Sequence, residues 1–212
     1  MSIVGKKFPD LNVNAMNEMG DTISVNVLKE AVENKKKVLL FWYPKDFTFV
    51  CPTELHAFQA ALPEFEKRNT IVIGASCDTA EVHFAWLNTP KDEGGIEGVT
   101  YNLLADSNRN LSSILGILDS TNERFDEETG TVLMDGDNVS YRATYVLDEE
   151  GVVFHEGINN MPIGRNVDEY LRIIDALTHV QEKGEVCPAN WEEGKEAMNA
   201  DRKGVQSYLS NN

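Results

Sequence analysis

A short run of almost unbroken apolar residues, Lys37–Tyr43 (KVLLFWY), constrains the fold of this chain more than any other feature. Such a run is typical of a strand buried on both faces, because a strand with one solvated face alternates apolar and polar residues. A second run of this kind, Thr70–Ser76 (TIVIGAS), follows after a segment of helical pattern. Two buried strands separated by a helix need a sheet covered on both sides, so we expect an α/β fold.

Between these strands, Pro52 fits the first turn of a helix, and Pro63 should kink or break that helix. The remaining elements follow from hydrophobic periodicity, turn residues and helix caps. In chain order they are a helix over Thr79–Thr89, a short strand at Leu103–Leu104, a helix over Ser107–Leu115, a hairpin of Ala143–Leu147 with Val152–His155, and a helix over Asn166–Gln181. This order predicts a central mixed β-sheet flanked by helices.

Two regions fall outside this pattern. Residues 119–138 hold seven Asp or Glu against one Arg, and residues 188–212 lack a sustained apolar stripe. We expect solvated surface in the first region and an extended C-terminal arm in the second. The predicted organisation is therefore one domain over residues 1–180 and an arm over residues 181–212.

The composition narrows the class of protein. Of the 212 residues, 42% are hydrophobic, which is enough for a folded core. We find neither a signal-peptide pattern nor the roughly 18 continuous apolar residues of a membrane span, and expect a cytoplasmic protein. The net charge of -16 argues against nucleic acid and membrane surfaces as partners.

The cysteines point to a functional thiol. There are three, Cys51, Cys77 and Cys187, with no C-x-x-C motif, and the four histidines are scattered, so we expect no metal site and no cofactor. Cys51 directly precedes Pro52, at the predicted start of a helix, where the helix dipole favours a thiolate. Thr48, three residues earlier, is close enough to hydrogen-bond the sulfur. Position alone leaves Cys51 as either a small core residue or a functional thiol, whereas Cys77 follows a buried strand and is expected to pack.

The residues around two of the cysteines resemble a known family. Pro44-x-x-x-Thr48-x-x-Cys51, within FWYPKDFTFVCPTEL, resembles the active-site signature of the peroxiredoxins. Gly184–Trp191 (GEVCPANW) resembles the resolving-cysteine segment of their typical two-cysteine subgroup, which includes the alkyl hydroperoxide reductase C subunits. Further matches between them are GAS (74–76), AW (85–86) followed by NTP (88–90), and PIGRNVDE (162–169).

This resemblance implies a thioredoxin-like fold and a thiol-dependent peroxidase that reduces hydrogen peroxide and organic hydroperoxides in antioxidant defence. Cys51 is then the peroxidatic nucleophile that becomes a sulfenic acid. Cys187 of the partner subunit forms an intersubunit disulfide with it, which thioredoxin or a flavoprotein disulfide reductase reopens. The resemblance further implies a homodimer that assembles into a decameric ring.

The resemblance also assigns roles around Cys51. Lowering the pKa of a thiol from about 8.5 to about 6 gains only about 2 kcal/mol in thiolate, so a fast peroxidase must also stabilise the breaking O–O bond. Arg142 matches the active-site arginine of the family, which would do this. Thr48 would position the peroxide, Pro44 would shield the pocket, and Glu54 with Arg165 would orient Arg142.

Two alternative functions stay open, and the sequence departs from the family pattern in one respect. A holdase chaperone or peroxide-relay protein would use the same thiols without rapid turnover, and a general disulfide reductase is disfavoured by the missing C-x-x-C. Gly94–Gly98 (GGIEG) and Tyr208-Leu209 are imperfect versions of the family elements linked to over-oxidation. They predict intermediate sensitivity of Cys51 to sulfinic acid formation.

Overall fold

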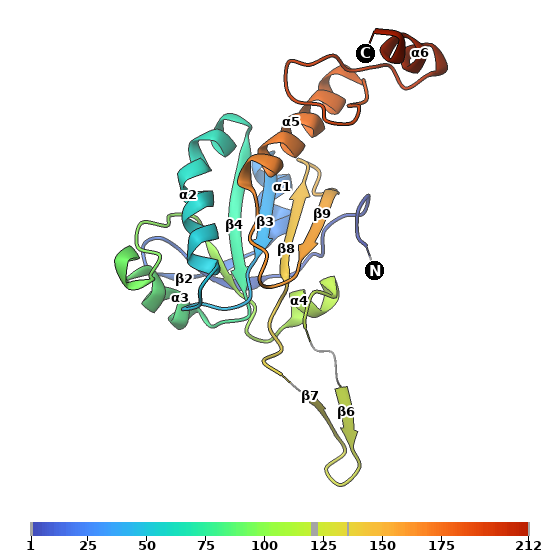
Figure 1. The fold of residues 1–212 in the computed structure, drawn as a ribbon. Helices are drawn as coiled ribbons and strands as arrows, with labels where there is room; N and C mark the ends of the chain where they lie inside the picture. Colours follow the sequence, from blue (N-terminus) through green and yellow to red (C-terminus); the bar gives the residue numbers. More distant parts are fainter. Residues whose placement is uncertain (1, 120–122, 135, 212) are drawn as a thin grey trace. The chain divides into compact units, whose positions relative to one another are not determined.

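The apolar run at residues 37–42 forms strand β3 (Lys37–Trp42), which is buried along its whole length. It lies between β4 (Thr70–Ser76) and β8 (Arg142–Leu147) in a seven-stranded sheet with the order β2-β1-β5-β4-β3-β8-β9 (Figure 1). β3 pairs with β4 in parallel and with β8 in antiparallel orientation, so the predicted mixed sheet is confirmed. The structure, a computed structural model, describes residues 2–119, 123–134 and 136–211.

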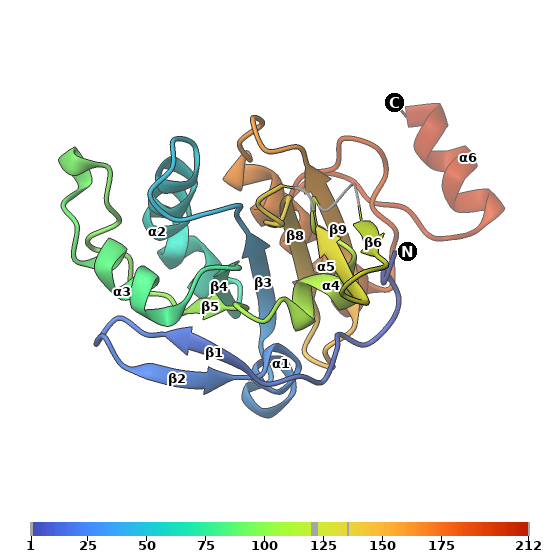
Figure 2. The same ribbon diagram turned by 90° about the horizontal axis from the view of Figure 1, so that it is seen from below.

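Helices cover both faces of this sheet. The other strands of the sheet are β1 (Val13–Met16), β2 (Thr22–Val25), β5 (Leu103–Ala105) and β9 (Val153–Asn159), and the helices that accompany it are α1 (Val27–Asn34), α2 (Cys51–Lys67), α3 (Ala80–Leu87) and α4 (Asn110–Leu115). On one face, Phe58 of α2 stacks on Phe41 of β3 with ring centroids 4.1 Å apart. On the other face, α1 and α4 contribute Ala31 and Leu111 to a core cluster with Leu40 (Figure 2).

The chain divides into two compact units, Met1–Arg165 and Asn166–Asn212. The second unit contains α5 (Val167–Lys183) and α6 (Arg202–Asn211). As the sequence predicts, the Asn166 side chain caps α5 and Gly184 ends it in the left-handed conformation. The functional division at residues 180 and 181, between a peroxidase domain and an arm, stays a prediction.

Three expectations were wrong in detail. Pro63 does not break α2: the helix continues through this exposed residue, and Phe58 and Phe65 on either side of it are both buried. The helix expected over Ser107–Leu115 begins only at Asn110, because Arg109 adopts the left-handed conformation with φ 58°. The arm is not extended throughout, since its last residues form α6.

The polar segments hold more structure than their composition indicated. The described part of residues 119–138 forms a hairpin of β6 (Glu123–Asp126) and β7 (Thr131–Met134), not merely solvated turns, whereas 120–122 and 135 lie outside the described residues. The first 36 residues, to which hydrophobic periodicity assigned no element, form β1, β2 and α1. Asn26 caps α1 by accepting a hydrogen bond from the Lys29 backbone N–H.

Candidate active site

The loop between β3 and α2 places Cys51 at the start of a helix, as Pro52 predicted. Cys51 is the first residue of α2, and its side chain is fully buried. The helix dipole at this end favours negative charge on the sulfur. The site is therefore a buried thiol in an electropositive setting, which distinguishes it from a packing cysteine.

Two side chains reach the Cys51 sulfur. The Thr48 hydroxyl lies 3.0 Å from Sγ and also 2.8 Å from the Lys45 carbonyl oxygen. A hydroxyl has a single proton, so Thr48 donates to the sulfur or to the carbonyl, but not fully to both. From β8, Arg142 directs Nη1 toward Sγ at 3.4 Å. The predicted proximity of Thr48 and Arg142 to Cys51 is thus present in the structure.

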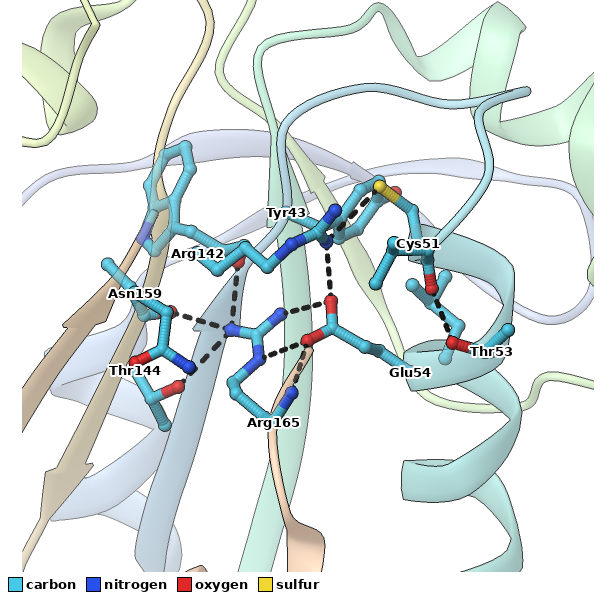
Figure 3. A network of polar contacts seen from close by, with 12 residues as sticks. Tyr43, Cys51, Thr53, Glu54, Arg142, Thr144, Asn159 and Arg165 are labelled. Carbon is cyan, nitrogen blue, oxygen red and sulfur yellow. Dashed lines mark hydrogen bonds and ion pairs between the residues drawn. The ribbon is translucent and has the colours of Figure 1, made fainter. Parts of the chain in front are cut away.

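Glu54 fixes the orientation of Arg142. One turn along α2 from Cys51, its Oε2 accepts a hydrogen bond of 2.6 Å from Arg142 Nη1 (Figure 3). Arg142 Nε donates to the Met161 carbonyl oxygen at 2.6 Å. The guanidinium is therefore held on two sides, with one nitrogen shared between the carboxylate and the sulfur.

Arg165 holds Glu54 from the opposite side (Figure 3). Its Nε and Nη2 donate to the two carboxylate oxygens at 2.9 and 2.8 Å, and its backbone N–H donates to Oε1 at 2.9 Å. Nη1 of Arg165 donates to backbone oxygens of Trp42 and Ala143, and the guanidinium lies 5.1 Å from the Phe41 ring centroid. Arg165 does not contact Cys51 in these interactions and acts on it only through Glu54.

The charges of this cluster do not cancel without the sulfur. The side chains of Arg142, Glu54 and Arg165 are at most 4% exposed, so two cations are buried with one carboxylate. An uncompensated buried charge is costly. A thiolate at Cys51, next to Arg142, supplies the missing negative charge. The arrangement therefore places a net positive charge beside the Cys51 sulfur.

A second buried polar cluster, which hydrophobic periodicity did not indicate, anchors the loop before Cys51. Asp46 lies in that loop, and its Oδ2 is 2.7 Å from Nδ1 of His83 on α3. Nε2 of His83 lies 3.1 Å from the Leu104 carbonyl oxygen and so carries the proton that it donates there. Between Asp46 and Thr48, Phe47 adopts φ 54°, a conformation that costs a side-chain-bearing residue about 1–3 kcal/mol. Contacts on both sides of Phe47 hold this strained loop.

Burial and the contact between Asp46 and His83 shift the pKa values of the groups in this cluster. Desolvation raises the pKa of Asp46, and His83 only partly offsets that effect. For His83, burial alone would lower the pKa, but the adjacent Asp46 carboxylate raises it above the ordinary histidine value. Desolvation, together with Asp46, also raises the pKa of Tyr43 well above its usual value.

The other predicted residues lie as follows. Pro44 is buried just past the end of β3, and Trp42, Tyr43 and Trp86 belong to the core. Cys77 is buried, and desolvation raises the pKa of its thiol to about 11, which fits the predicted packing role. Cys187 lies in the second unit and is half-buried.

Among residues 2–119, 123–134 and 136–211, no group of three or more His, Cys, Asp or Glu side chains could hold a metal ion. None of the helices in this part of the chain is long and apolar enough to cross a membrane.

Comparison with known protein families identifies the family to which the chain belongs. The profile of the AhpC/TSA family matches residues 4–156, and that of the C-terminal domain of 1-Cys peroxiredoxin matches residues 176–211. The chain is 39% identical over 210 residues to the chloroplastic 2-Cys peroxiredoxin BAS1 of Hordeum vulgare, covering 99% of this chain and 91% of that protein. It is 42% identical over 178 residues to alkyl hydroperoxide reductase C of Helicobacter pylori, covering 84% and 82%.

A solved structure agrees with these sequence relatives. Reduced 2-Cys peroxiredoxin of Plasmodium vivax superposes with a TM-score of 0.87 at 40% identity, covering 99% of this chain and 100% of that chain. The likeness spans both compact units.

Proposed function

Because this chain belongs to the AhpC/TSA family and is a thiol-specific peroxidase of the two-cysteine type with a thioredoxin-like fold, we propose that Cys51 is its peroxidatic nucleophile and Cys187 its resolving cysteine. One observation carries the proposal for Cys51: its buried sulfur lies beside Arg142, in a cluster that has one more cation than anions. Cys77 lies 3.7 Å from the Ser112 hydroxyl, and desolvation raises the pKa of its thiol to about 11, which disfavours the thiolate at neutral pH.

The first step is attack of the Cys51 thiolate on the distal oxygen of the peroxide. An S–O bond forms and the O–O bond breaks, which leaves a sulfenic acid on Cys51 and releases water or an alcohol after protonation. Charge builds on the leaving oxygen during this step. Arg142, held by Glu54 and the Met161 carbonyl, is positioned to stabilise that charge without reorganising, and the Thr48 hydroxyl is positioned to bind the peroxide.

The second step requires local rearrangement. Cys51 is 0% exposed, so the first turn of α2 has to open before another thiol reaches it. Cys187 of the partner subunit then attacks the sulfenic sulfur, forming the S–S bond and expelling water. The disulfide is reopened by an external reductant, either thioredoxin or a flavoprotein disulfide reductase.

Two exposed apolar regions support the proposed homodimer and decameric ring. β9 is an edge strand of the sheet and exposes Phe154 and Ile158, which suits pairing with a second copy. Phe47 and Phe49, on the loop before Cys51, are 54% and 94% exposed, which suits a second contact between dimers. We also propose a reducing compartment, the cytoplasm, since the cycle consumes thiol reductant.

Steady-state turnover tests this proposal. Consumption of hydrogen peroxide and of an alkyl hydroperoxide is measured with thioredoxin plus its reductase as reductant, for the wild type, Cys51→Ser and Cys77→Ser. We expect many turnovers per subunit in the wild type and in Cys77→Ser, and none in Cys51→Ser. Consumption of one equivalent only, with dithiothreitol also failing to sustain it, would instead favour a relay or holdase protein.

A further inference from the structure

The segment that carries Cys187, Gly184–Trp191, is held against α5 at three points. Cys187 Sγ lies 3.8 Å from the carbonyl oxygen of Ala176. Arg172 Nη1 donates to the Trp191 carbonyl oxygen at 3.3 Å. His179 contacts the Trp191 ring, with ring centroids 5.0 Å apart. We call this segment the docked segment.

These three contacts come from one face of α5. Residues 172, 176 and 179 are spaced by four and three positions, which places them in one row along a helix. The Cys187 sulfur lies against the α5 backbone, and its side chain is half-buried. Because a disulfide brings two sulfurs to about 2.05 Å, the contact with α5 restricts the directions from which another thiol can reach Cys187, and release of the docked segment removes that restriction.

His179 makes two contacts with the docked segment, one near each of its ends. Its ring packs on Trp191, and its Nε2 lies 3.0 Å from Oε2 of Glu185. Arg172, by comparison, is already bound through Nε and Nη2 to Glu169 on α5 itself. His179 is thus the side chain of this row whose polar contact is made with the docked segment itself.

We propose that His179 and Glu185 form a positioning pair that keeps Cys187 docked on α5 and so sets the rate at which the disulfide forms. The proposal rests on the roles proposed above for Cys51 and Cys187. Two reactions compete for the Cys51 sulfenic acid. Attack by Cys187 forms the disulfide and releases water, whereas a second peroxide molecule transfers an oxygen atom, leaves a sulfinic acid and releases water or an alcohol. A tighter dock gives the second reaction more time.

The pair is weak enough to open during turnover. The His179 and Glu185 side chains are 21% and 37% exposed, and polar pairs that solvent reaches contribute little to stability. Removing the pair is therefore expected to change the opening equilibrium by about two- to fivefold. Losing the ring contact as well should enlarge the effect to about tenfold.

Three variants separate these contacts. Glu185→Gln weakens the polar contact with His179, His179→Phe keeps an aromatic ring on Trp191 but removes that contact, and His179→Ala removes both. Glu182→Gln, at an exposed position near the end of α5, is the matched control for loss of one carboxylate. Reduced protein is mixed rapidly with peroxide, quenched with acid and alkylated. Nonreducing gels and mass spectrometry then follow the sulfenic acid, the disulfide and the sulfinic acid with time.

The expected result is an unchanged rate of Cys51 oxidation in all variants. Disulfide formation should be about two- to fivefold faster in Glu185→Gln and His179→Phe, with the ratio of sulfinic acid to disulfide lower by the same factor. Glu182→Gln should match the wild type. Unchanged or slower disulfide formation in both Glu185→Gln and His179→Phe overturns the inference, and these mild variants guard against a misfolded His179→Ala. A wild type that forms no disulfide at all would instead overturn the proposed roles of the two cysteines.

Discussion

Replacing Arg142 by methionine removes the cation beside Cys51 while keeping a side chain of similar length. Glu54 keeps its three hydrogen bonds to Arg165, so the substitution does not leave the carboxylate unpaired. Two contributions are lost. The interaction with the thiolate is a charge-assisted hydrogen bond, of roughly 1.5–3 kcal/mol. Stabilisation of the leaving oxygen is comparable to an oxyanion-hole donor, about 2.7–4 kcal/mol, and predicts a 10²- to 10³-fold slower reaction with peroxide.

The two contributions are separable because alkylation needs a thiolate but breaks no O–O bond. Stopped-flow measurements give the rate constant for peroxide, and iodoacetamide gives the rate constant for alkylation of Cys51. The alkylation rate constant should fall by about 10- to 10²-fold, which is the part of the loss that comes from the hydrogen bond to the thiolate. The peroxide defect should be about tenfold larger than the alkylation defect, because the missing cation also fails to stabilise the leaving oxygen.

Arg202, an exposed residue of α6, provides the control. Arg202→Met removes one positive charge, as Arg142→Met does, but at a position far from Arg142 in the sequence. We expect that variant to match the wild type in both assays. A peroxide rate constant in Arg142→Met within threefold of the wild type would refute the role assigned to Arg142. So would equal defects in the two assays, because Arg142 would then act on the thiolate alone.

Three further predictions follow from the same structure. Thr48→Val should slow the peroxide reaction by about 10- to 10²-fold in stopped-flow assays, whereas Thr48→Ser, which keeps the hydroxyl, should stay within about threefold. Iodoacetamide at neutral pH should leave Cys77 unlabelled in peptide mass spectra, because burial raises the pKa of its thiol to about 11; rapid labelling would contradict this. The raised pKa values of His83 and Asp46 mean that the folded state binds protons more tightly than the unfolded chain, so the free energy of unfolding should fall as pH rises through the folded-state pKa of His83. Urea titrations between pH 6 and 9 should show a slope of at most about 1.4 kcal/mol per pH unit for each proton, and a flatter profile in His83→Gln.

The core strands and the position of Cys51 were predictable because local sequence determines them. The run at 37–42 forms β3 because it is central in the sheet and buried on both faces. Pro52 marks the start of α2, and Asn166 and Gly184 mark the two ends of α5. The contacts of Glu54 with Arg142 and Arg165 were predicted only through the family resemblance. Glu54 is 88 residues from Arg142 and 111 residues from Arg165 in the sequence, so no local pattern links them.

What hydrophobic periodicity did not indicate depends on tertiary contacts. Asp46 and His83 lie on a loop and a helix, 37 residues apart, and no local pattern links them. Helix α2 continues across Pro63, and the aromatic residues on both sides of the proline are buried. The β6–β7 hairpin is polar and its apolar residues Phe125 and Val132 are exposed, so it has no buried face to give a strand signal.

The most direct test is a nonreducing gel of the reduced protein after one equivalent of hydrogen peroxide, with Cys51→Ser and Cys187→Ser beside it. The proposed mechanism predicts a covalent dimer from the wild type and from neither variant. No covalent dimer from the wild type, with Cys51 still open to alkylation, would contradict it. A dimer that persists in Cys187→Ser would show that another thiol resolves the Cys51 sulfenic acid.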